Sequence, residues 1–250
     1  TFTENGFEDT SQPVALDRDG IAQTLDDFAN AARCAKDAGF DGVEVHSANG
    51  YLLDQFLTVH TNLREDEYGG PIEKRVKFHC EVMQSVRDAA PNVPVGVRIS
   101  QTKVNDLTYV WPDGDDDAKV VFPAIAATGI DFFDCSAHLG LDHVFGTDRS
   151  LSGLARRHTG LPVFANGKLH DPELADRAIA EEEGDFVAIA KGALADPEWP
   201  QKIAAGLEPV PFNPAMVMPF ATLDCNEAFW KENPSGVPDE PVVARDGVES

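Results

Sequence analysis

Three residues that could bind and protonate a polar substrate lie within six positions of one another, in the segment GFDGVEVHSANGYLLDQFL (39–57). The imidazole of His46 and the amide of Asn49 can both donate hydrogen bonds to a single oxygen atom, which would stabilise an oxyanion. The phenol of Tyr51 could serve as a general acid for a carbanion. A structural role is equally open, in which His46 binds a backbone carbonyl and Tyr51 packs in the core.

The place of these residues in the chain favours chemistry. Residues 41–47 have the pattern of a buried strand that ends near the histidine. α/β folds place their binding and catalytic groups at the carboxyl ends of parallel strands. We therefore expect His46 and Asn49 to point into one pocket, in a loop on that edge of a sheet.

Helix and strand patterns alternate along the rest of the chain. Helices are predicted at 19–38, 72–89, 115–129, 149–160, 171–184 and 196–206, and strands at 41–47, 93–100, 130–137, 161–167 and 184–190. This alternation predicts an α/β fold with a parallel sheet, either an open doubly wound sheet or part of a (β/α)8 barrel. The absence of G-x-G-x-x-G after the first strand counts against a Rossmann dinucleotide site. A domain at 1–207 is expected to be followed by an irregular, Pro-rich tail at 208–250 that packs on it.

Composition excludes several partners. The 250 residues are 42% hydrophobic, as in globular proteins, and contain no long apolar run that could cross a membrane. The net charge of −23, from 43 acidic and 20 basic residues, would repel nucleic acid and anionic membranes. Since the acids are scattered, we favour a salt-loving source. The four cysteines lack metal-site spacing, which predicts free thiols in the cytoplasm and no metal site.

Several motifs carry a family resemblance. HSANGYLLDQFL followed by NLREDEYGG resembles the old yellow enzyme family of FMN-dependent ene-reductases. PIEKRVKF, VGVRIS and GDFVAIAKGALADPEWPQKI resemble further motifs of that family, and the similarity runs from about residue 15 to about residue 205. The resemblance implies a (β/α)8 TIM barrel with FMN at its carboxyl-end mouth. Five strands are predicted here, so only about strands 4–8 of such a barrel are expected.

The resemblance also implies roles for individual residues. NADH or NADPH would reduce FMN, and flavin N5 would pass a hydride to the β-carbon of an enone or nitroalkene. His46 and Asn49 match the pair that binds the substrate carbonyl oxygen, and Tyr51 matches the residue that protonates the α-carbon. Arg98 matches an arginine beside flavin N1 and the C2 carbonyl. A cation that closes a β-branched run needs a partner in any case.

Two strand ends match the family's phosphate-binding region. Asn166, Gly167 and Lys168 lie between a strand and a helix, where a glycine allows backbone N–H groups to approach an anion. After the next strand the family usually has Gly-Arg, whereas this chain has Ala190 and Lys191. Lysine supplies a point charge without the fork of arginine, and alanine adopts a positive φ less readily than glycine.

The number of strands leaves alternatives open. The chain could be a fragment of a longer enzyme, or a half-barrel whose N-terminal half is a second polypeptide. It could also be a shortened, flavin-free relative that serves as a non-catalytic binding or assembly protein. Within the family, a dienoyl-CoA reductase-like enzyme would need an iron–sulfur cluster, but only Cys225 lies in the region where its ligands belong. A homo-oligomer is also possible.

Overall fold

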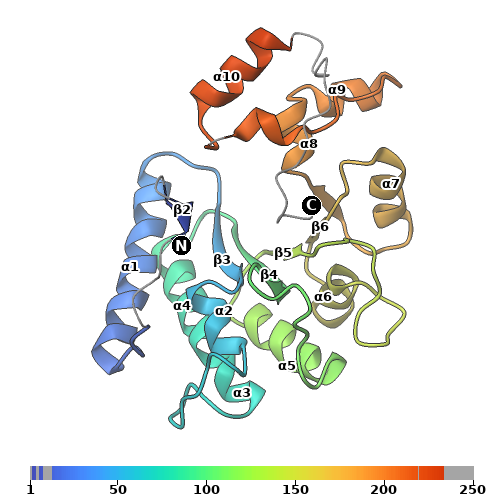
Figure 1. Ribbon diagram of the computed structural model, residues 1–250. Helices are drawn as coiled ribbons and strands as arrows, with labels where there is room; N and C mark the ends of the chain where they lie inside the picture. Colours follow the sequence, from blue (N-terminus) through green and yellow to red (C-terminus); the bar gives the residue numbers. More distant parts are fainter. Residues whose placement is uncertain (1, 4–5, 8–12, 219, 234–250) are drawn as a thin grey trace.

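The main sheet forms one side of a barrel. The computed structural model describes residues 2–3, 6–7, 13–218 and 220–233 (Figure 1). In this part of the chain the sheet contains five parallel strands that neighbour one another in sequence order. The strands are β3 (Val43–Asn49), β4 (Val95–Lys103), β5 (Phe132–Ser136), β6 (Val163–Asn166) and β7 (Phe186–Ala188). A doubly wound sheet would reverse its strand order at a switch point, so the barrel prediction is the one confirmed.

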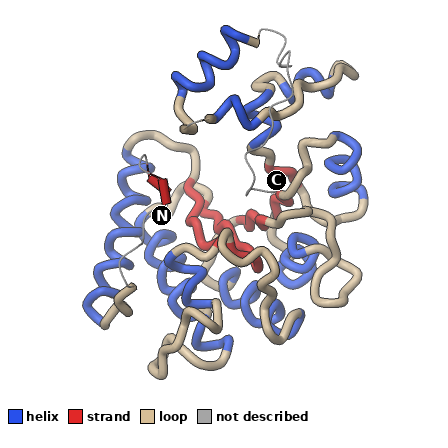
Figure 2. Tube along the Cα trace, in the orientation of Figure 1, coloured by secondary structure: helices blue, strands red, loops and turns tan. Residues whose placement is uncertain are grey.

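The helices up to residue 180 lie around the outer side of the sheet, and those from residue 191 onward form a separate group (Figure 2). Asp17 caps the first helix by accepting a hydrogen bond from the Gly20 N–H, and Asp171 caps another in the same way. The helices are α1 (Arg18–Asp37), α2 (Leu52–Leu57), α3 (Ile72–Arg75), α4 (Lys77–Ala89), α5 (Asp115–Ala126), α6 (Leu151–Thr159), α7 (Pro172–Ala180), α8 (Lys191–Ala195), α9 (Trp199–Ala204) and α10 (Leu223–Glu232). A short antiparallel pair, β1 (Phe2–Thr3) with β2 (Gly6–Phe7), precedes them. None of the helices in the described ranges is long and apolar enough to span a bilayer.

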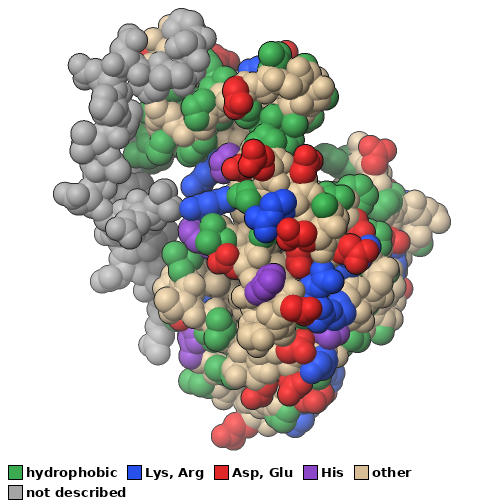
Figure 3. Space-filling model, turned by 90° about the vertical axis from the view of Figure 1, so that its right-hand side faces the viewer, with side chains coloured by type: hydrophobic (Ala, Val, Ile, Leu, Met, Phe, Trp, Pro, Cys, Tyr) green, Lys and Arg blue, Asp and Glu red, His purple; other side chains and the backbone are tan. Residues whose placement is uncertain are grey.

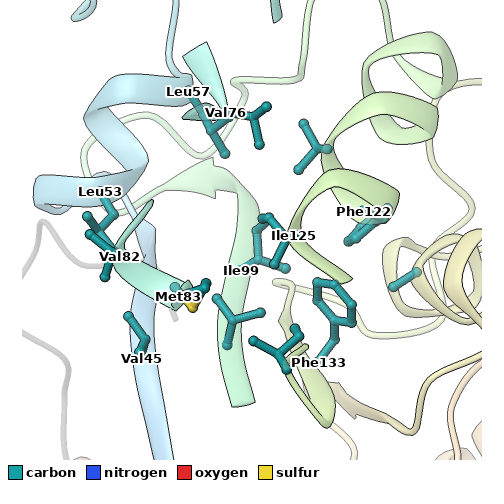
Figure 4. Close-up of a cluster of buried hydrophobic side chains, with 14 of the residues drawn as sticks. Val45, Leu53, Leu57, Val76, Val82, Met83, Ile99, Phe122, Ile125 and Phe133 are labelled. Atoms are coloured by element: carbon teal, nitrogen blue, oxygen red, sulfur yellow. The ribbon is translucent and has the colours of Figure 1, made fainter. Parts of the chain in front are cut away.

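The two faces of the sheet differ because strand side chains alternate. Ile99 and Phe133 point outward and are fully buried against α4 and α5, with Phe122 and Ile125 among their neighbours (Figure 4). This outer layer is the hydrophobic core that holds the wall together.

The inner face carries a row of aromatic rings. The ring centroids of Phe132 and Phe164 are 5.4 Å apart, and those of Phe164 and Phe186 are 4.8 Å apart. Gly96 faces the same row, where a Cβ atom would lie 2.1 Å from the Phe132 ring. A glycine is therefore required on β4 at this point, so that the aromatic ring can cross the strand.

The prediction of an irregular tail is wrong for much of its described part. Residues Pro214–Val217 form a 3₁₀ helix (η1) and residues 223–232 form α10, which Thr222 caps by accepting from the Cys225 N–H. Met216 and Phe229 form a separate small core with Ala195 of α8. The proline content concealed these short helices, although Thr222 is a recognisable N-cap. Residues 219 and 234–250 of the expected tail, and 1, 4–5 and 8–12 of the expected domain, lie outside the described residues.

Candidate active site

A tight turn at the carboxyl end of β3 brings an imidazole and a phenol together. The register of β3 shifts between Ser47 and Asn49, and Asn49 and Gly50 have φ of 64° and 85°. Asparagine and glycine tolerate this left-handed backbone better than other residues. The turn makes Tyr51 the N-cap of α2 and places its ring over His46, with 5.3 Å between the ring centroids.

Both rings are open to solvent. The Tyr51 side chain is 55% exposed, and His46 is also exposed. Partial desolvation lowers the pKa of His46, and the nearby Arg98 guanidinium lowers it further. At neutral pH His46 is therefore a neutral imidazole, which can donate one ring N–H to a substrate oxygen. The convergence of the Asn49 amide with His46 on the same oxygen stays a prediction.

Arg98 has the partners that a cation at the end of a buried strand requires. It pairs in register with His46, and its Nη1 lies 3.2 Å from Asp134 Oδ2. Its Nη2 lies 3.3 Å from Ser136 Oγ and 3.4 Å from Asn166 Oδ1. The guanidinium of this β4 residue is thus held on the inner face by partners on two strands, β5 and β6. Asp134 and Ser136 were not among the residues expected from the sequence, although their alternation with Phe132 in IDFFDCSA was an available signal.

A second acid shares this inner face. Desolvation on the inner face and the negative charge of Asp134 raise the pKa of Glu44 to about 7 although the residue is exposed, and Arg98 only partly opposes the rise. Glu44 is therefore close to half-protonated at neutral pH, and its charged form destabilises the fold.

Replacing Glu44 should stabilise the protein in a pH-dependent way. The folded pKa of about 7 lies above the ordinary value of 4.5, so the folded state binds more protons between these values and loses stability as the pH rises through this window. Glu44→Gln removes that loss. Its thermal midpoint, relative to wild type, should increase from pH 4 to pH 8, as measured by calorimetry. The exposed Glu65→Gln is the matched control for one lost charge, and a Glu44→Gln difference that does not grow with pH would contradict this assignment.

At the end of β6, Gly167 allows the backbone of residues 137–140 to approach closely. Gly167 has a φ of 131°, and a Cβ there would lie 2.6 Å from the Ala137 oxygen. Its carbonyl accepts the Gly140 N–H at 2.9 Å. The Asn166 amide donates to the Ala188 oxygen at 2.8 Å and accepts from Arg98, so this side chain links strands of the sheet. Its place in a phosphate site stays a prediction.

Two lysines are available for an anion. Lys168 and Lys191 are exposed and line one hollow of about 910 Å³, together with His170 and Gly192. Lys191 begins α8, and its Nζ lies 5.6 Å from the centre of the Phe212 ring. The φ of Ala190 is −116°, so the expected difficulty of placing alanine here does not arise.

These groups fit an anionic, planar cofactor such as FMN. Arg98 presents a fixed cation on the inner face, and the paired lysines provide positive charge at the ends of β6 and β7. In the described ranges no cluster of three or more His, Cys, Asp or Glu side chains is arranged to hold a metal ion.

A barrel wall with polar groups at the carboxyl ends of its strands is the architecture of (β/α)8 enzymes. Residues 3–209 match the sequence model of the NADH:flavin oxidoreductase / NADH oxidase family, so the chain belongs to that family. The resemblance seen in the motifs is thereby confirmed.

Individual relatives agree with this membership. The chain is 34% identical over 206 residues to an NADH oxidase of Thermoanaerobacter brockii, covering 78% of this chain and 31% of that protein. It is 30% identical over 204 residues to an NADPH dehydrogenase of Bacillus subtilis (strain 168), covering 80% and 59%. The solved old yellow enzyme homologue of Zymomonas mobilis matches with a TM-score of 0.72 at 27% identity, covering 96% of this chain and 64% of that one. The chain thus spans from about a third to just under two thirds of these proteins.

Proposed function

We propose that this protein is an FMN-dependent oxidoreductase that uses NADH or NADPH to reduce the C=C bond of small α,β-unsaturated carbonyl compounds or nitroalkenes. The observation that carries the proposal is the placement of Tyr51 over His46 at the carboxyl end of β3, beside Arg98, in a chain of the NADH:flavin family. When bound, FMN supplies the hydride for the alkene β-carbon.

Individual residues bind the substrate, supply the proton and hold the cofactor. Neutral His46 and the Asn49 amide bind the substrate carbonyl oxygen and stabilise the negative charge that develops there. The exposed Tyr51 delivers a proton to the α-carbon from a position over that oxygen site. Arg98 would hold the flavin ring and supply positive charge to its reduced, anionic form. Lys168 and Lys191 hold the phosphate near the backbone of Gly167.

The cofactor site needs a closed wall around it. Among the described residues, β3 and β7 each pair on one side only. We propose that further barrel strands, from the same polypeptide or from a second chain, cover these edges and the aromatic inner face. Native mass spectrometry of the FMN-loaded protein distinguishes the two sources.

The test of the function is a titration in two stages. Addition of FMN to the complete protein should quench flavin fluorescence at a defined stoichiometry, and NADH or NADPH should then bleach the bound flavin anaerobically. Addition of 2-cyclohexenone should restore the oxidised spectrum. Bound flavin that neither enones nor nitroalkenes reoxidise would exclude the proposed reaction. Failure of the complete protein to bind FMN would favour the binding or assembly alternative.

We also propose that the acidic surface is an adaptation to a saline cytoplasm. Acidic side chains are spread over the visible face among basic ones (Figure 3). The cysteines of the described residues are all free thiols, which supports a reducing compartment such as the cytoplasm. The net charge of −23 makes the carboxylates repel one another, and salt screens that repulsion.

The thermal midpoint should therefore rise from low salt to molar KCl. Scanning calorimetry in a KCl series measures this, and sucrose at matched osmolality controls for solvent exclusion. A midpoint that stays flat or falls with KCl, while sucrose raises it, would show that charge screening contributes nothing to stability.

A further inference from the structure

A buried ion pair supports the turn that carries Asn49 and Tyr51. Asp54 of α2 is 0% exposed, and Lys103 at the end of β4 is 2% exposed. Lys103 Nζ lies 2.6 Å and 2.7 Å from the two oxygens of the Asp54 carboxylate. One of those oxygens, Oδ2, also accepts the Gly50 N–H at 2.7 Å. The pair is therefore bonded directly to the middle residue of the turn.

The same turn is attached to β4 by its neighbouring backbone. The Asn49 N–H donates to Ser100 Oγ at 2.8 Å, and the Val104 N–H donates to the Asn49 oxygen at 3.2 Å. Gly50 lies against the stem of Lys103, where a Cβ would be 3.3 Å from the Lys103 Cβ. Among the hydrogen bonds described for the turn, only that of the Gly50 N–H has a charged acceptor, and bonds to charged acceptors are the stronger ones.

Stability alone gives no reason for burying these two charges. Burial raises the pKa of Asp54 and lowers that of Lys103, and in each case the partner opposes the shift. Replacing such a pair by apolar residues of similar volume is often neutral or stabilising. What an apolar pair cannot supply is an acceptor for the Gly50 N–H.

We infer that Asp54 and Lys103 are positioning residues for the reduction of activated alkenes, because they fix the Asn49–Gly50–Tyr51 turn and so hold the Tyr51 phenol over His46. This inference rests on the proposed function. Tyr51 directly follows Gly50, so a rotation of the Gly50 peptide would displace the phenol from its place 5.3 Å from the imidazole.

Two double variants separate positioning from stability. Asp54→Asn with Lys103→Met and Asp54→Leu with Lys103→Met both remove the buried charges and keep similar volumes. Only the first of them, with an amide at position 54, keeps an oxygen that can accept the Gly50 N–H. The methionine retains the lysine stem next to Tyr109, whose ring centre lies 4.8 Å from Lys103 Nζ.

The first readout is amide hydrogen exchange at Gly50, measured by NMR in the protein without FMN. Exchange in the leucine double variant should be faster than in wild type by roughly tenfold or more, the share of a hydrogen bond to a charged acceptor. Exchange in the asparagine double variant should stay closer to wild type. Arg149→Met is the control, since it removes a partly buried cation elsewhere in the fold, paired with Glu183 at 3.3 Å, and should leave Gly50 unchanged.

The second readout is the separate rate of each half-reaction in the FMN-loaded protein. The leucine double variant should slow reoxidation by 2-cyclohexenone by roughly tenfold or more, and reduction by the nicotinamide should change little. If either double variant fails to fold, Lys103→Met against Lys103→Arg tests the charge on the acceptor instead. Without the cation the buried Asp54 carboxyl is held protonated, so its bond from the Gly50 N–H weakens and exchange should be faster in the methionine variant, with rescue in the arginine variant.

Equal Gly50 exchange in the two double variants would overturn the inference, as would faster exchange with an unchanged enone step. A wild-type protein that binds FMN but reduces no enone would instead defeat the proposed function. The exchange contrast, which needs no cofactor, would then still show whether the pair fixes the turn.

Discussion

Tyr51→Phe should slow the reoxidation of reduced, FMN-loaded protein by an enone by roughly 10²- to 10⁴-fold, the usual contribution of a general acid. The substitution removes only the hydroxyl and keeps the ring that lies over His46. Reduction of the flavin by NADH or NADPH should stay nearly unchanged, because that step needs no proton from Tyr51. Stopped-flow absorbance at the flavin band measures the two half-reactions separately.

Nitroalkenes form a more stable carbanion than enones, so they should suffer less from the loss of the phenol. Tyr68→Phe is the matched control, since it removes a hydroxyl that donates to Glu81 on the outer helices at 2.9 Å. A Tyr51→Phe protein that is slow in the nicotinamide half and normal in the enone half would show that the role assigned to Tyr51 is wrong. If both halves are normal, Tyr51 takes no part in the reaction.

His79→Phe should reduce the protein's sensitivity to acid. His79 of α4 is fully buried, and neither ring nitrogen has a hydrogen-bond partner among the described residues. Burial lowers its pKa to about 3, and the charge of Lys103 adds to the shift. In the unfolded chain the pKa is about 6.5. The stability that neutral His79 contributes is therefore fully present above pH 6.5 and is lost as the pH falls toward 3, by about 1.4 kcal/mol for each pH unit.

Urea unfolding at several pH values between 7.5 and 4.5 measures this loss. The free energy of unfolding of His79→Phe should fall less steeply with acid than that of wild type, so the difference between the two proteins should widen below about pH 6.5. The exposed His143→Phe serves as the control for loss of a histidine. Parallel pH profiles for His79→Phe and wild type would mean that His79 is protonated in the folded state without penalty.

Local patterns predicted the elements of the wall but few of their contacts. The apolar runs indicated β3 to β7 in order, and caps such as Asp171 marked helix starts. The predicted helix 72–89 is divided at Val76 into α3 and α4. The spacing of its apolar residues is continuous across Val76 and so does not predict the break.

The polar contacts of the site join residues far apart in the chain. Arg98 meets Asp134 and Asn166 across 36 and 68 positions. Lys103 reaches Asp54 across 49 positions. Such pairs depend on the register of parallel strands and on loop paths, and a single sequence predicts neither. The turn at Asn49 and Gly50 is local, which explains why its place in a site could be expected from the residues themselves.

The most direct test of the account is a single turnover with product analysis. Reduced, FMN-loaded protein is mixed anaerobically with one equivalent of 2-cyclohexenone, and the products are separated by gas chromatography. We predict that oxidised flavin returns together with one equivalent of cyclohexanone, because His46 and Asn49 bind the carbonyl oxygen while the C=C bond is reduced. Formation of 2-cyclohexenol, or return of oxidised flavin without a saturated ketone, would contradict the proposed reaction.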